Sequence, residues 1–259
     1  MGFAATSQRP IPGAVATLGV SDRVAFLRRT YGLLGLALIA WPILTAAIFT
    51  MAPGVGYKLL IAGGGMGWLI VIGGFMLVSY LANKLAMSES SRGLQLLGLG
   101  LEVGAWSILL QPMIWILAIK FGDKNFASLS ASGAPVLSAA AYAILMKSVV
   151  VTLAIFVGLT LTVFISKKDF TFLGGFLSMC AFAAMGVALA SILFGFSLGV
   201  IYCGLLVLLM GGYILYQTSV ILTRFPPQAY VAAALMLFST VATLFWYVLQ
   251  LFMSSSRRN

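Results

Sequence analysis

Long apolar runs recur along the whole chain and constrain its fold more than any other feature. Each run has few or no charged residues and reaches the ~20 residues that a helix needs to cross the hydrocarbon core of a bilayer. The runs cover residues 31–50, 59–82, 93–119, 143–166, 170–194, 197–223 and 228–253. They lack the short alternating pattern of a membrane barrel, and lipid offers no other way to pair the backbone of a strand. We therefore predict an all-α integral membrane protein with seven membrane-spanning helices.

Composition excludes a water-soluble fold. Of the 259 residues, 62% are hydrophobic and only 8% are charged, whereas about a quarter are charged in soluble domains. The formal charge of +10 does not indicate nucleic-acid binding, because the basic residues lie at the ends of apolar runs and not in a patch with interleaved aromatic residues. The expected surroundings are a lipid bilayer, without a nucleic-acid partner.

The residue types that most enzymes use are largely missing. The chain has no histidine, so neither a His-based triad nor a Cys/His metal cluster can form. Cys180 and Cys203 lie inside apolar runs, where a thiol usually behaves as a small buried hydrophobe. We find no Ser/Lys dyad or carboxylate pair at a plausible spacing, and we predict no catalytic site, cofactor or metal.

The polar segments give the domain boundaries and the orientation. We expect a cytoplasmic tail at 1–29, a membrane domain at 30–253, a short tail at 254–259 and a connector at 120–142. Basic residues favour the cytoplasmic side of a membrane. With the N-terminus inside, nine lie on that side, namely Arg9, Arg23, Arg28, Arg29, Lys84, Arg92, Lys167, Lys168 and Arg224. Six lie outside, namely Lys58, Lys120, Lys124, Lys147, Arg257 and Arg258. The bias predicts an N-in, C-out protein.

Glu102 is the strongest candidate for a functional site. It lies about nine residues into its run, which places it roughly 13 Å deep at 1.5 Å per residue. An ionised carboxylate is costly there and often belongs to an ion path, a proton site or a buried pair. A protonated or hydrogen-bonded carboxyl that only joins helices is the simpler alternative. Lys147 is the candidate cationic partner, although its long side chain can instead extend to the membrane interface, which we favour.

Small residues and helix breakers suggest where helices meet or loosen. Spacings of the small-x-x-x-small type allow helix backbones to approach closely. They occur at Gly100/Gly104, Gly186/Ala190 and Gly195/Gly199. Pro42, Pro112 with Gln111, and the glycines at 63–65 can loosen helices, and such breaks sometimes form ion sites.

Four segments of the chain resemble one membrane-protein family. They are FLRRTYGLL at 26–34, SKKDF at 166–170, GYILYQTS at 212–219, and YVAAALMLF at 230–238 with Leu244-Phe245. Their order and spacing are similar to the entry into the first helix, a short loop after the fourth, and motifs of the sixth and seventh helices in the Bax inhibitor-1/YccA-like family, also called the transmembrane Bax-inhibitor-motif family. Residues 50–140 agree only in hydrophobicity. The resemblance implies a seven-helix bundle of Bax-inhibitor type.

The chain departs from this family at the positions that carry its best-known chemistry. The resemblance implies a pair of aspartates on the sixth and seventh helices, acting as a proton-sensitive latch for a calcium leak. Gln217 stands at the first position, and Thr240, beside Ser239, stands at the second. Two carboxylates can share a proton, but an amide and a hydroxyl cannot. We expect a fixed polar contact between these helices instead, worth about 1 kcal/mol.

Two functions stay open. Some bacterial members of the family lack the second aspartate, and that branch resembles a partner of a membrane-anchored, ATP-dependent quality-control protease. The leading hypothesis is therefore a non-enzymatic accessory subunit of the bacterial inner membrane, bound to such a protease or to a larger complex. The alternative is a Ca²⁺ or H⁺ leak in which Glu102 replaces the aspartates as the titratable group.

Overall fold

The computed structural model describes residues 13–17, 19–62, 66–88, 91–121, 137–166, 168–196 and 198–255. In chain order the elements are the 3-10 helix η1 (Val15–Thr17) and the α-helices α1 (Val20–Met51), α2 (Pro53–Ala62), α3 (Met66–Ala86), α4 (Arg92–Leu109), α5 (Gln111–Phe121), α7 (Ala139–Ser166), α8 (Leu173–Phe194), α9 (Val200–Arg224) and α10 (Tyr230–Ser255). Outside the described residues lie the glycines at 63–65, most of the connector 120–142, and the basic residues Arg9, Lys124, Lys167, Arg257 and Arg258.

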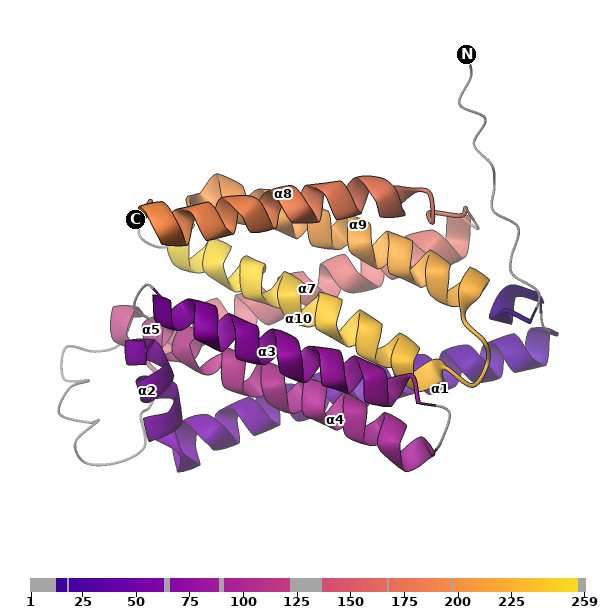
Figure 1. Ribbon diagram of the computed structural model, residues 1–259, viewed down its shortest axis with the longest axis horizontal. Coiled ribbons are helices and arrows are strands. Elements are labelled where there is room, and N and C mark those ends of the chain that lie inside the picture. Colours follow the sequence, from indigo (N-terminus) through magenta and orange to yellow (C-terminus); the bar gives the residue numbers. More distant parts are fainter. Residues whose placement is uncertain are drawn as a thin grey trace, which may run out of the picture.

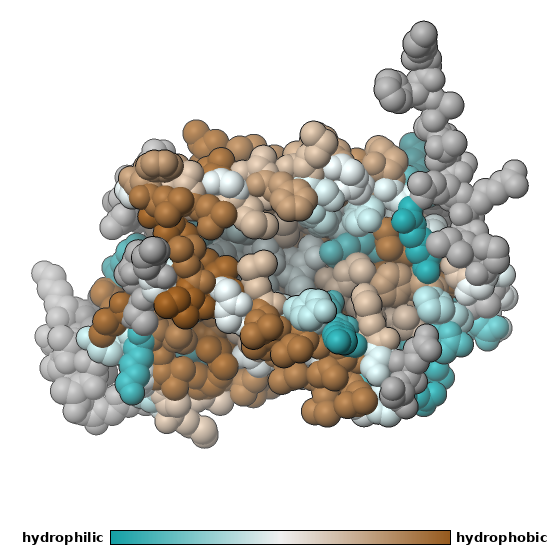
Figure 2. All heavy atoms as spheres, in the orientation of Figure 1, coloured by the Kyte–Doolittle hydropathy of each residue, from teal (hydrophilic) through white to brown (hydrophobic). Residues whose placement is uncertain are grey.

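Seven helical stretches are long and apolar enough to cross a membrane, with α4 and α5 forming one of them. This confirms the predicted seven-span, all-helical fold. Figure 1 shows these helices running along one common long axis, with α1 beginning at one end of the bundle and α10 ending at the other. On the face shown in Figure 2, hydrophobic side chains cover the middle, and hydrophilic ones gather mainly towards the two ends of the long axis.

Helix α10 lies at the centre of the bundle (Figure 1). It packs against α1, α3, α4, α7 and α9. Of the residues in its most apolar stretch, 72% are buried, against 6% for the corresponding stretch of the peripheral helix α8. The run Ala232–Ala234 is buried, and these short side chains let neighbouring helices come close where hydrophobicity alone does not drive association. A polar residue in the buried middle of α10, such as Thr240, therefore faces another helix and not lipid.

Helix α1 begins at Val20, earlier than the boundary at residue 30 expected from hydropathy. Its first turn carries Asp22, and an acidic residue there is favoured by the helix dipole, so this polar stretch is helical without being apolar. Just before it, the backbone N–H of Val15 donates to the Phe225 carbonyl at 3.0 Å. The segment that precedes the first span thus docks on the turn between α9 and α10.

The second and third spans also differ from the predicted runs. Pro53 starts the separate short helix α2, as proline suits the first position of a helix, and the second span begins only with α3. The third span is interrupted between α4 and α5 because Pro112 has no N–H to give to the carbonyl one turn before it. Pro42, by contrast, lies inside a continuous α1.

The small-residue pairs do not pack helices together as predicted. A Cβ added at Gly100, Gly104 or Gly186 would meet nothing within 4 Å, and the same holds at Gly195 and Gly199, so the prediction is wrong within this chain. Gly195 instead ends α8 with a φ of 72°, a conformation that glycine adopts without strain.

The close approach between α3 and α4 occurs at Gly98. A Cβ on this residue would lie 2.5 Å from the Ala82 carbonyl oxygen and 2.7 Å from the Ala86 nitrogen. Both atoms belong to the backbone of α3, so no side chain can move aside. Gly98 is therefore the residue that sets the spacing of this helix pair.

Candidate functional site: a polar cluster on the central helix

Two adjacent polar residues of α10, Ser239 and Thr240, connect this helix to neighbours on two sides. Successive residues of a helix point about 100° apart, since a turn holds 3.6 residues. Ser239 accordingly meets α4, while Thr240 meets α9. The pair joins three spans in the middle of the bundle.

Towards α9, the Thr240 hydroxyl donates to Gln217 Oε1 at 2.7 Å. The same hydroxyl lies 3.2 Å from the Met236 carbonyl of its own helix. Thr240 is buried and Gln217 is half-buried. The expected contact between an amide and a hydroxyl is present, and neither group carries a charge that changes with pH. This contact holds α9 against α10 without a titratable pair.

Towards α4, the Ser239 hydroxyl donates to Glu102 Oε1 at 2.8 Å. Trp106 donates to the same oxygen through its indole Nε1, at 3.1 Å. Glu102 is only 2% exposed, and its other carboxyl oxygen, Oε2, has no hydrogen-bond partner in the part of the chain that the structure describes. The carboxyl is thus held by two uncharged donors at one oxygen, while its second oxygen is unpaired.

Lys147 lies apart from Glu102. Its side chain is exposed on α7, and no ion pair joins the two residues within the described ranges. The structure therefore brings together Glu102, Ser239, Thr240 and Gln217 through α10, but not Lys147. The position of Lys147 agrees with a side chain that reaches towards the membrane interface.

The break between α4 and α5 is closed by a side chain. Gln111 is fully buried, and its Nε2 donates to the Thr45 carbonyl of α1 at 3.0 Å and to the Ser107 carbonyl at 3.2 Å. Carbonyls near a helix break can bind ions when they are free. Here the Gln111 amide binds two carbonyls next to the break, those of Ser107 and Thr45, and so joins α1 to the third span.

Trp106 is the partner of Glu102 that the sequence analysis missed. The two residues are four apart, a spacing that puts side chains on the same helix face, so an indole donor for the carboxyl could have been anticipated. The role of Ser239 was missed for a different reason. Its partner lies 137 positions away along the chain, and only the packing of α4 on α10 brings them together.

The cluster offers hydrogen bonds between helices but few metal ligands. Among the described residues, no group of three His, Cys, Asp or Glu side chains could hold a metal ion. Its chemistry is that of one buried carboxyl and several neutral donors. Such an arrangement can fix helix positions or, through Glu102, take up a proton.

Comparison with known proteins places the chain in a family. The model of a family described as "Inhibitor of apoptosis-promoting Bax1" matches residues 125–257, which is just over half of the chain. The protein belongs to the Bax inhibitor-1 family. The matched part contains α9 and α10 with Gln217, Ser239 and Thr240, while Glu102 precedes it. The contact between Ser239 and Glu102 therefore joins the part that matches the family to the part that does not.

Two curated relatives agree with this assignment. The chain is 34% identical over 113 residues to "Bax inhibitor 1" of Schizosaccharomyces pombe, covering 42% of the chain and 41% of that protein. It is 29% identical over 108 residues to "Protein lifeguard 4" of Mus musculus, covering 41% of the chain and 45% of that protein. The chain thus spans less than half the length of each relative. No solved structure matches it.

Proposed function

We propose that this multi-pass membrane protein of the Bax inhibitor-1 family does not conduct ions and acts as an accessory subunit of another membrane protein. The observation that carries the proposal is the 2.7 Å hydrogen bond between Thr240 and Gln217. It occupies the positions where the family resemblance implies a titratable aspartyl pair. A neutral contact has no proton to gain or lose near pH 7, so this joint stays closed across the physiological range.

A groove between α3 and α4 supports association with a partner. It has a volume of about 690 Å³ and is lined by apolar residues together with Gly74, Gly93, Gly100 and Gly104. Cβ atoms at Gly74, Gly100 and Gly104 would meet nothing within 4 Å, so these glycines are not needed for packing within the chain. Glycines let a second helix backbone approach closely in lipid. The occupant that suits this groove is a membrane-spanning helix of another protein.

The family resemblance also motivates a proposal for the partner and the location. We propose a membrane-bound quality-control protease or a larger membrane complex as the partner, and no catalytic activity of the chain itself. The bacterial inner membrane, with the N-terminus inside, is the proposed location, and the excess of basic residues in the segments assigned to the cytoplasm supports that orientation.

Photo-crosslinking in native membranes tests the accessory role. A photo-reactive phenylalanine analogue would replace Leu97, which lines the groove and is 59% exposed, or Leu205 on α9, which is 60% exposed and lies outside it. We expect a discrete crosslinked protein adduct only when the analogue is at position 97. This adduct should disappear when Gly100→Leu fills the groove. Lipid adducts alone at both positions would overturn the proposal.

One observation favours the second candidate, an ion leak. Glu102 Oε2 is buried without a hydrogen-bond partner among the described residues, and unpaired carboxyls in membranes often belong to ion or proton paths. Calcium and proton flux into proteoliposomes decides between the two, with Glu102→Gln as the matched variant. The leak requires a flux that changes with pH and disappears in Glu102→Gln. The accessory role predicts no flux from either protein.

A further inference from the structure

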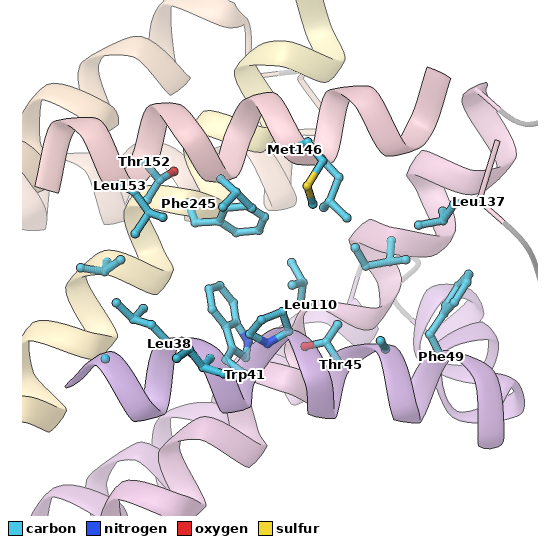
Figure 3. A pocket seen from close by; sticks show the side chains of 18 of the residues that line it. Leu38, Trp41, Thr45, Phe49, Leu110, Leu137, Met146, Thr152, Leu153 and Phe245 are labelled. Atoms are coloured by element: carbon cyan, nitrogen blue, oxygen red, sulfur yellow. The ribbon is translucent and has the colours of Figure 1, made fainter. Parts of the chain in front are cut away.

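A cavity lies between α1 and α7. Both helices pack on α10, and the side chains between them enclose about 680 Å³. Figure 3 shows Trp41 and Thr45 projecting from α1 towards α7 across this space, with Phe245 of α10 lining it as well. The volume lies in the range of sites that bind small molecules, roughly 300–1,000 Å³.

The wall of this cavity is apolar except for Trp41, Thr45, Thr50 and Thr152. Trp41 Nε1, Thr45 Oγ1 and Thr152 Oγ1 are unpaired in the part of the chain that the structure describes. The three residues are 6%, 6% and 2% exposed. A threonine hydroxyl can turn back to a carbonyl of its own helix, but an indole N–H has no such option. Buried donors of this kind call for a hydrogen-bond acceptor from outside the chain.

The cavity opens sideways. Two of its lining residues, Ile39 on α1 and Leu153 on α7, are 62% and 40% exposed, so its rim reaches the surface that lipid covers in a membrane. Along α1 it extends from Gly35 to Thr50, or roughly 22 Å at 1.5 Å per residue. That is more than half the ~30 Å thickness of a hydrocarbon core. Its shape suits an extended chain that enters from the bilayer.

Basic side chains gather near one end of the cavity. Lys58, Lys120 and Lys147, all exposed, lie on the helices around the end where Phe49 and Leu137 line it. The opposite ends of α1 and α7 carry both signs of charge, with Asp22 and Asp169 near Arg23, Arg28, Arg29 and Lys168, while Glu102 is buried within the bundle. The helices that carry these lysines, α2, α5 and α7, contain no acidic residue, so an anionic headgroup would be attracted to this end.

We propose that this cavity binds one acyl chain of an anionic bilayer phospholipid. The ester carbonyl accepts a hydrogen bond from the buried donors of α1, Thr45 or Trp41. The hydrocarbon tail runs towards Gly35 and Leu153, and the phosphate lies towards the lysines. The bound lipid fills the gap between α1 and α7, which no side chain of the described residues fills.

Retention of lipid by the full chain tests the proposal. The protein would be reconstituted in nanodiscs that contain equal amounts of phosphatidylglycerol and phosphatidylcholine, and released lipid complexes would be counted by native mass spectrometry. We expect one retained phosphatidylglycerol, at least tenfold above phosphatidylcholine. Val149→Trp fills the cavity from α7 and should reduce retention at least tenfold. The matched control is Val150→Trp, on the neighbouring residue that is 65% exposed to lipid, and it should leave retention unchanged.

The polar contacts have their own variants, which remain informative if Val149→Trp does not fold. Thr45→Val removes one donor at nearly constant volume, and Trp41→Phe removes the indole N–H with a smaller aromatic ring. The combined variant should weaken retention about tenfold. The control Thr162→Val changes an exposed hydroxyl that bonds to the Gly158 carbonyl within α7, and should have no effect.

Three results would overturn the proposal. The first is equal retention of the two phospholipids by the wild-type protein. The second is unchanged retention in a folded Val149→Trp or in the double donor variant. The third comes from a separate arm with oleate: if free fatty acid is retained and phospholipid is not, the acyl chain does not come from a phospholipid.

Discussion

A double-mutant cycle across α9 and α10 measures the neutral contact at the centre of the bundle. Thr240→Val removes the hydroxyl that donates to Gln217 Oε1 at 2.7 Å, and Gln217→Met removes the acceptor at similar volume. Hydrogen bonds between helices in a membrane contribute about 0.6 kcal/mol on average and up to ~1.7 kcal/mol. Thr240 is buried and the bond is short, so we expect a coupling free energy of about 1 kcal/mol.

The assay is reversible unfolding of the purified protein in bicelles at pH 5 and pH 8. Because neither partner is ionisable in this range, the coupling should be the same at both values. A control cycle pairs Gln217→Met with Thr243→Val, whose hydroxyl bonds to the Ser239 carbonyl within α10, and should show no coupling. A Gln217–Thr240 coupling free energy below ~0.3 kcal/mol would refute the reasoning. So would a coupling that differs between pH 5 and pH 8 by more than the ~0.3–0.5 kcal/mol by which independent mutations deviate from additivity.

Two further sites give predictions that the same unfolding assay checks. Gly98→Ala should destabilise the protein by about 1–3 kcal/mol, because the new Cβ overlaps backbone atoms of α3, whereas Gly100→Ala meets open space and should be neutral or stabilising by up to ~1 kcal/mol. Equal effects of the two glycine variants would contradict the packing of α3 on α4. Glu102→Leu leaves the Trp106 indole N–H without this acceptor and the Ser239 hydroxyl with only the Leu235 carbonyl of its own helix, and should cost about 1–3 kcal/mol. Glu102→Gln keeps an acceptor oxygen and should stay within ~1 kcal/mol of the wild type. A loss as large in Glu102→Gln as in Glu102→Leu would show that the negative charge matters and not the hydrogen bonds.

The number of spans was predictable because it depends on segment length and hydropathy alone. Lipid leaves each apolar run little choice but a helix. The interruptions of the helices were harder to predict, because they depend on how the surrounding structure accommodates a proline. Pro42 and Pro112 both lack an N–H, yet only Pro112 accompanies an interruption. There, Gln111 can donate to the carbonyls beside it.

The candidate site was predictable residue by residue, but its contacts were only partly so. The depth of Glu102 in an apolar run indicated a buried carboxyl, and the family resemblance indicated that Gln217 and Thr240 face each other. The link from Glu102 to Ser239 could not be read from the sequence, because it depends on which face of α4 packs on α10. The small-residue spacings misled for the same reason, since Gly98 and not Gly100 faces α3.

Calcium flux into proteoliposomes, measured between pH 5 and pH 8, tests most directly whether the α9–α10 joint is a closed, non-titrating contact. The wild-type protein should show no flux at any pH. In the variant Gln217→Asp with Thr240→Asp, two carboxylates would take positions whose oxygens now lie 2.7 Å apart. They would share a proton near neutral pH, and the variant should show a flux that depends on pH. A wild-type flux that changes with pH, or a double variant indistinguishable from the wild type at every pH, would contradict this account.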